Sequence, residues 1–290
     1  MNKTGSLVLP RFGQKFFGLL MGAPLLLWQA IFFLFPITYI VILSFYTVEF
    51  FQIQSELTLS SWIHIYSADF FWSAFGRSLL GASVAVILIN LVAFPCSYFI
   101  GIHCKPLTRK ILTGIMLVPF FTNYVIRAYS WRNMLGEEGV VNFILAVVGL
   151  GPFTMTNNLF GTVVGYATLA LPLVLLLQVF ALSFVDRRLI EASYNLGASG
   201  VRTLFKVIIP SARVGLILAL AFSFVLTFGD FVSPTFIGGN RPPVLSTLLV
   251  DQIRAGNHWP RASVVAITMF SFLFAVVASA LWLAYRRGGR

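Results

Sequence analysis

The chain has 290 residues, of which 58% are hydrophobic and 10% are charged, and its formal net charge is +11. Soluble domains carry about 25% charged residues. A soluble protein of this length could not bury so much apolar surface, and with a mean hydropathy of +0.90 the expected solvent is lipid. Such a net charge would indicate nucleic-acid binding in a soluble protein, but the placement of the basic residues indicates membrane topology instead.

Six stretches are apolar enough to cross a bilayer, because a core of about 30 Å needs roughly 20 helical residues. They are residues 22–46, 74–101, 111–130, 159–184, 212–237 and 262–285. The basic residues before the first stretch resemble a signal peptide, but the apolar run is too long and lacks a small-residue cleavage site. We therefore expect an uncleaved first helix and an all-α integral membrane protein with six transmembrane helices.

The basic residues also predict the orientation. The N-terminus, the loops 102–110 and 185–213 and the C-terminal tail hold 14 of the 20 Lys and Arg residues, whereas the loop 47–73 holds none. The positive-inside rule therefore places both termini and the loop 185–213 in the cytoplasm.

We expect a single membrane domain. Residues 1–73 form an N-terminal segment with the first helix and a periplasmic loop, 74–285 carry the other five helices, and 286–290 are a basic tail. The loop 47–73 is long enough for short interfacial helices and too short for a folded receptor. Within the fourth stretch, Gly161 and Gly165 lie one turn apart, a weak signal for close helix packing.

Neither the cysteines nor the histidines indicate redox or metal chemistry. Cys96 lies in the second stretch and Cys104 in a cytoplasmic loop, so a disulfide is not expected. The three histidines fall in three different loops, which gives no metal-ligand spacing. They are His64, His103 and His258.

Aromatic and charged residues crowd the end of the third stretch. Anchoring at headgroup depth is the simpler interpretation of the aromatic residues, with stacking on a ligand as the alternative. The acidic pair Glu137 and Glu138 would attract a cation or a docked receptor, although solvated loop residues are the simpler interpretation. Arg127 disfavours a cation path unless an acid neutralises it. The candidate path residues here are Arg127, Tyr129, Trp131 and Glu137.

The loop 186–212 has the features of a docking helix. Asp186 can cap a helix that starts near Arg187, and Gly197 suits the left-handed residue that ends it. Apolar and small residues then recur at a spacing of three to four on one face. They are Leu189, Ala192, Ser193 and Leu196. The alternative is an amphipathic helix that lies on anionic lipid.

Residues 191–210 read EASYNLGASGVRTLFKVIIP. This run resembles the EAA loop of ABC-importer permeases, which is Glu-Ala-Ala, three residues, Gly, nine residues and Ile-x-Leu-Pro. The matching positions are Glu191, Ala192, Ser193 for the second Ala, Gly197, Val207 for Ile, Ile209 for Leu, and Pro210. The resemblance implies a type I ABC-importer permease fold in the bacterial inner membrane. It implies ATPase coupling through Glu191, Ala192, Ser193, Leu196, Gly197, Ala198 and Pro210.

The sequence contains no motif for binding and hydrolysing ATP. Its most P-loop-like run, 197–203, has neither the spacing nor the Lys-Ser/Thr pair that cradles phosphates. We therefore expect a transport subunit with no enzyme activity and no cofactor of its own, with ATP and Mg bound by a separate ATPase. The resemblance implies a second permease subunit in a heterodimer, two cytoplasmic ABC ATPases and a periplasmic binding protein. Membrane lipid is the other partner, and nucleic acid is not one.

A second resemblance concerns the cargo. The segments 118–143 and 228–239 resemble the corresponding segments of spermidine/putrescine permeases, and the whole resemblance covers roughly residues 75 to 285. The matching positions are Pro119, Arg127, Tyr129, Trp131, Leu135, Gly139, Asn142, the run Gly229 to Pro234, Gly238 and Gly239. It implies a translocation path for polyamines. Permeases for iron, thiamine and other small solutes share parts of these motifs, so another small solute is the alternative.

Asp230 is the one acid inside a predicted span. A charge at the bilayer centre costs about 2.5–3.5 kcal/mol on insertion scales, so this carboxylate should face a cavity or a partner. It suits a polycation, or it caps the broken turn near Pro234, or it pairs with Arg127. We expect Pro234 to act as a hinge for alternating access.

Two other classes of protein fit less well. An ion-coupled secondary transporter would need several intramembrane ionisable groups as relays. A membrane enzyme would need a nucleophile and base, or a metal cluster, at membrane depth. Asp230 alone supports neither class.

Overall fold

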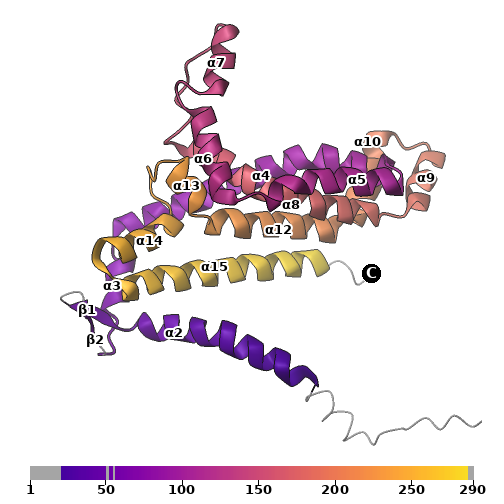
Figure 1. Cartoon of the computed structure of the whole chain (residues 1–290). Helices are drawn as coiled ribbons and strands as arrows, with labels where there is room; N and C mark the ends of the chain where they lie inside the picture. Colours follow the sequence, from indigo (N-terminus) through magenta and orange to yellow (C-terminus); the bar gives the residue numbers. More distant parts are fainter. Residues whose placement is uncertain (1–20, 50–51, 55, 287–290) are drawn as a thin grey trace, which may run out of the picture.

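The computed structural model describes residues 21–49, 52–54 and 56–286, and the described chain is mostly helical. The predicted basic residues of the N-terminus, and all of the predicted tail except Arg286, lie outside the described residues. Four long helices form the centre of the molecule (Figure 1). They are α4 (Asp69–Tyr98), α8 (Leu159–Ser183), α12 (Arg213–Gly229) and α15 (Trp259–Tyr285).

Helix α8 packs against both α4 and α12, and α15 packs against α12. Small residues allow these contacts, as expected for helices that associate in lipid. A Cβ atom placed on Gly165 would lie 2.5 Å from Cβ of Ser233, and one placed on Gly215 would lie 2.4 Å from Cβ of Ala181. The close approach predicted from Gly161 and Gly165 is confirmed, and its partner is the segment around Ser233 and Ile237.

The predicted all-α membrane fold is confirmed. Four continuous helical stretches are long and apolar enough to cross a membrane: Met21–Leu43, Asp69–His103, Leu159–Ser183 and Trp259–Tyr285. Two further spans arise only if a bent pair of helices counts as one. These are Pro106–Phe121 with Tyr124–Val147, bent by 87°, and Gly200–Ser211 with Arg213–Gly229, bent by 74°.

The predicted third and fifth spans therefore contain breaks that hydropathy alone did not reveal. In the third, the chain turns at Asn123, whose side-chain oxygen accepts hydrogen bonds from the backbone N–H of Val125 (3.0 Å) and Ile126 (3.3 Å). The predicted fifth span runs to residue 237, whereas α12 ends at Gly229. A polar side chain lies at each break, since Asn123 caps α6 and Asp230 accepts from the backbone N–H groups of Val232 and Ser233 in α13.

The first span lies at the edge of the molecule, where its α2 part contacts α15. Helix α2 (Phe35–Leu43) leads into a hairpin of β1 (Thr47–Glu49) and β2 (Gln52–Gln54), and then into α3 (Ser60–Tyr66). The short helix agrees with the interfacial helix expected in this loop, and the hairpin was not predicted. Helix α3 packs against α15, where the Tyr66 hydroxyl lies 2.8 Å from Thr268 Oγ1.

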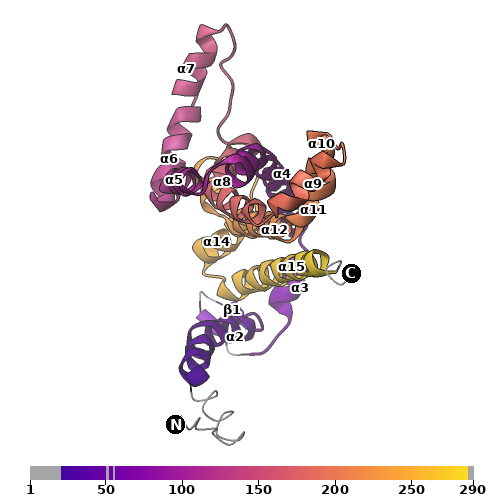
Figure 2. The ribbon, with the colours of Figure 1, turned by 90° about the vertical axis from the view of Figure 1, so that its right-hand side faces the viewer.

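The remaining helices lie at the two ends and on one flank. Figure 2 shows α7 and α2 extending from the centre in opposite directions, with α9 to α11 beside α12. Their bounds are α5 (Pro106–Leu117), α6 (Tyr124–Leu135), α7 (Val140–Val147), α9 (Arg187–Asn195), α10 (Gly200–Thr203), α11 (Ile209–Ser211), α13 (Val232–Phe236) and α14 (Leu245–Gly256). Single turns of other helix types complete the fold at Ala30–Leu34, Phe99–His103, Val118–Phe121 and Leu204–Ile208.

Candidate functional site

Helix α9 forms where the sequence predicts a capped helix. The Asp186 carboxylate accepts a hydrogen bond of 2.9 Å from the backbone N–H of Arg188. Gly197 adopts a left-handed conformation, with a φ of +79°. The backbone N–H of Ala198 then bonds to the carbonyl of Ser193 at 3.1 Å. Both predicted ends of the helix are therefore confirmed.

One side of α9 is tied to the membrane helices. The hydroxyls of Ser193 and Thr203 lie 3.0 Å apart and join α9 to α10. Ile190 packs on the cluster that contains Leu182 and Ile208. The Arg187 guanidinium donates to the carbonyl of Ile102 at 3.1 Å. These contacts tie α9 to α10, to the end of α8 and to the turn that follows α4.

The opposite side of α9 faces outward. Glu191 and Ala192 are exposed, and Leu196 is 88% exposed. Ser193 differs from the prediction, since it is buried against Thr203 instead of lying on the outer face. Ala198 is half-buried, and Pro210 is exposed in α11, just before the bend into α12.

The sequence interpretation missed two apolar residues beside α9. Val201 is 68% exposed and Phe205 is 64% exposed. Their spacing of four residues was the available signal, since it puts both on one helix face. Neither residue was among the predicted coupling residues.

Asp230 lies in the break between α12 and α13. Its side chain is 7% exposed. One carboxylate oxygen accepts from the backbone N–H of Val232 at 2.8 Å, and the other accepts from the backbone N–H and the hydroxyl of Ser233, at 3.2 and 2.5 Å. The Tyr124 hydroxyl also donates to the second oxygen. Asp230 therefore caps the broken turn near Pro234, as one of its predicted alternatives has it.

Tyr124 connects Asp230 with Arg127. The Arg127 guanidinium lies over the Tyr124 ring, 5.5 Å from its centroid, and donates to the carbonyl of Pro119. In the described part of the chain, Asp230 accepts hydrogen bonds from neutral donors and forms no ion pair with Arg127. The alternative in which the two residues pair directly is therefore wrong.

The other predicted path residues lie in α6, in the turn that follows it and in α13. Tyr129 is 46% exposed and its ring centroid lies 4.7 Å from that of Phe236 in α13. Trp131 packs against the buried cluster around Val232. Glu137 is exposed in the turn between α6 and α7. Pro234 is buried, and its carbonyl accepts from the backbone N–H of Asn240 at 2.8 Å.

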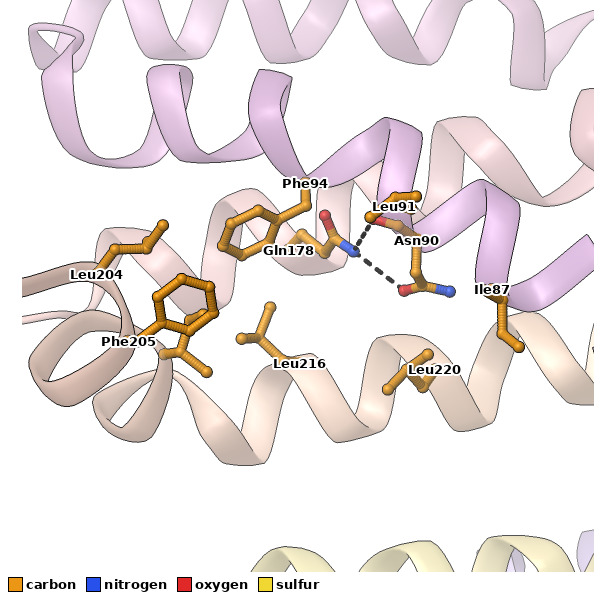
Figure 3. A pocket seen from close by; sticks show the side chains of 10 residues that line it. Ile87, Asn90, Leu91, Phe94, Gln178, Leu204, Phe205, Leu216 and Leu220 are labelled. Carbon is orange, nitrogen blue, oxygen red and sulfur yellow. Dashed lines mark hydrogen bonds between the residues drawn. The ribbon is translucent and has the colours of Figure 1, made fainter. Parts of the chain in front are cut away.

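A polar network inside the helical centre was also missed. Asn90 of α4 donates to Ser223 Oγ of α12 at 3.0 Å, and Gln178 of α8 donates to Asn90 Oδ1 at 3.0 Å. Figure 3 shows both amides beside a cavity of about 440 Å³, with Phe94, Leu216 and Leu220 among its apolar walls. The signal in the sequence was a single amide in each of two apolar stretches.

Solved structures share this architecture. A bacterial ABC transporter involved in the import of the acidic polysaccharide alginate superposes with a TM-score of 0.72 at 15% sequence identity. The match covers 95% of this chain and 97% of the transporter chain. At this identity the likeness concerns the fold.

Sequence relatives are permeases. The spermidine/putrescine transport system permease protein PotB of Haemophilus influenzae is 26% identical over 266 residues, 89% of this chain and 90% of the relative. The molybdenum transport system permease protein ModB of Azotobacter vinelandii is 27% identical over 209 residues, 68% of this chain and 89% of the relative. The model of the binding-protein-dependent transport system inner membrane component family matches residues 93–287. The chain belongs to this family, and it is a multi-pass permease subunit of an ABC importer in the bacterial inner membrane.

Proposed function

We propose that this permease conducts polyamines such as spermidine and putrescine, delivered by a periplasmic binding protein. The observation that carries the proposal is the buried carboxylate of Asp230, which has only neutral hydrogen-bond donors around it in the described structure. A buried negative charge attracts a cation and repels an anion such as molybdate or alginate. The similarity to PotB over 89% of the chain supports the same cargo.

The surroundings of Asp230 suit an extended polycation. Tyr124 and Tyr129 offer aromatic faces, on which an ammonium group is stabilised by about 0.5–2 kcal/mol. An ammonium group that reaches Asp230 would replace the hydrogen bond from Tyr124, which belongs to the separate helix α6. Glu137 would attract the cation to the mouth of the path. Arg127 is held by its contacts with Pro119 and Tyr124. Its positive charge would repel the cationic cargo and so confine it to the side of the carboxylate.

The break at Asp230 supplies the movement in this proposal. Pro234 sits in a five-residue helix, α13, between α12 and the loop that leads to α14. A short helix between two breaks can rotate without unfolding the spans on either side. We infer that Pro234 acts as the hinge, and that movement at α13 brings Asp230 toward or away from Tyr124 of α6 as the path opens and closes.

Helix α9 couples this movement to ATP in the same proposal. Glu191 would pair with a basic residue of a cytoplasmic ATPase, while Ala192 lets its backbone approach and Leu196 enters an apolar cleft. Gly197 and Ala198 would set the direction in which the chain leaves α9. Pro210 lies at the bend that leads to α12. ATP and Mg would be bound by two such ATPases, and a second, different permease would complete the path.

The decisive variant is Asp230→Asn. It keeps the shape of the side chain and removes the charge, so we expect ATP-driven spermidine uptake by the complete complex in vesicles to fall at least about tenfold, as the loss of a charge-assisted contact predicts. The reason is the loss of the buried negative charge that attracts the cargo.

Asp251→Asn is the matched control. Asp251 lies in α14 near the same end of the molecule and accepts a hydrogen bond of 3.2 Å from Asn240. We expect this variant to transport normally. An Asp230→Asn complex that assembles, hydrolyses ATP and imports spermidine at the wild-type rate would contradict the assigned role of the carboxylate.

A further inference from the structure

Three basic side chains meet at the end of the molecule opposite α9. His64 belongs to α3, His258 directly precedes α15, and Arg261 lies in the first turn of α15. All three line one cavity of about 280 Å³ beside the hairpin strand β1. Figure 1 shows α3, β1 and the start of α15 together at this end. Two histidines that the sequence places in separate loops are thus neighbours in space.

The cavity is built to attract an anion. Among the described residues that line it none is acidic, and within the same part of the chain none of the three basic side chains has an ion pair or a hydrogen bond. Thr47 and Ser60 add hydroxyl groups to the wall. The 27-residue helix α15 begins here, so the positive end of its dipole adds to the field.

Burial and a neighbouring positive charge both act on the two histidines. Burial first, and the neighbouring Arg261 charge second, lower the pKa of His64 below its ordinary value. Burial, Arg261 and His64 lower the pKa of His258 in the same direction. Three groups that repel one another's positive charge lie around one space, and a bound anion would relieve that repulsion.

The position of the cavity relative to the membrane spans indicates the source of the anion. It lies where two membrane spans meet the surface, since Thr47 follows the span Met21–Leu43 and Arg261 opens the span Trp259–Tyr285. Trp259 is 43% exposed at this level, as is usual for aromatic residues at headgroup depth. The first span has exposed apolar side chains along its length, against which acyl chains can lie.

We propose that this cavity binds the phosphate group of a phospholipid, held by Arg261, His64 and His258. The lipid would join α3 to α15 and so fix the first span, which otherwise packs loosely against the centre. Free phosphate offers the same chemistry from another source. This site is separate from the cargo path and does not depend on the proposed cargo.

The test is to count the phosphatidylglycerol molecules that stay bound to the purified complete complex, using native mass spectrometry during stepwise delipidation. We expect Arg261→Gln and His64→Gln each to weaken the retention of one lipid by about tenfold, since each removes a charge-assisted contact. Both residues lack partners within the described chain, so both variants should fold. Arg254→Gln is the matched control, because Arg254 is an exposed arginine of the neighbouring helix α14.

Two results would overturn the proposal. One is equal lipid retention by wild type, Arg261→Gln and His64→Gln. The other is that millimolar inorganic phosphate displaces the lipid and binds in its place, with Arg261→Gln abolishing phosphate binding, which would make free phosphate the ligand. Loss of the lipid in both variants, its retention in Arg254→Gln and its resistance to phosphate would establish the site.

Discussion

Asp230 is a buried acid whose carboxyl oxygens accept hydrogen bonds from Tyr124, Val232 and Ser233. Hydrogen bonds to a carboxylate contribute about 1.5–3 kcal/mol each, which offsets much of the cost of burying it. The same bonds fix the position of α13 against α6. One residue thus serves both as a cap and as the charge that the proposed cargo would meet.

Gly165 sets how closely α8 approaches this site. A Cβ atom here would lie 2.5 Å from both Cβ and Oγ of Ser233. Although Gly→Ala in a helix usually stabilises, we expect Gly165→Ala to destabilise the subunit by about 1–3 kcal/mol through overpacking.

Thermal unfolding of the purified complex in detergent measures this effect. Gly114→Ala in α5 is the control, because no atom lies within 4 Å of the position that its Cβ would take. If the two alanine variants unfold at the same temperature, the close contact between α8 and Ser233 does not limit stability.

At the level of whole elements, α9 is a helix held on one side and free on the other. Thr203, Ile190 and Arg187 fasten its inner side. The outer side ends at an exposed leucine, Leu196, which is 88% exposed. In the proposed coupling role, the ATPase subunit would cover this leucine.

Leu196→Asp should therefore weaken the binding of the ATPase subunit. Placing an unpaired charge at the centre of a contact costs at least about 2 kcal/mol, which is roughly 30-fold in affinity. Co-purification of the ATPase at graded concentrations measures it. Leu107→Asp in α5 replaces another exposed leucine, 70% exposed, and should leave binding unchanged. Equal binding by both variants would remove α9 from the contact.

The sequence was most informative where local chemistry decides the structure. Asp186 and Gly197 set the two ends of α9 because a cap and a left-handed residue act within a few residues. The break at Asn123 was missed, since hydropathy averages over a window and a single polar cap does not change the mean, whereas the broken turn near Pro234 was one of the predicted alternatives for Asp230. The inward side of Ser193 and the meeting of His64 with His258 depend on tertiary contacts that no local pattern encodes.

Over the whole molecule, the site at Asp230 and the site at α9 lie near opposite ends of α12. Asp230 terminates α12 at one end, and the bend after α11 starts α12 at the other. A rigid helix of 17 residues is about 25 Å long, so it can carry a displacement across most of a bilayer. This connection agrees with the proposed coupling of ATP hydrolysis to an opening near Asp230.

The most direct measurement is ATP-driven uptake of labelled spermidine into vesicles that hold both permeases, the ATPase subunits and the binding protein. The account predicts accumulation that requires ATP and the binding protein, is inhibited by unlabelled putrescine, and is unaffected by molybdate. A complex that assembles and hydrolyses ATP but accumulates no polyamine, or whose uptake is of molybdate, would contradict the proposed cargo.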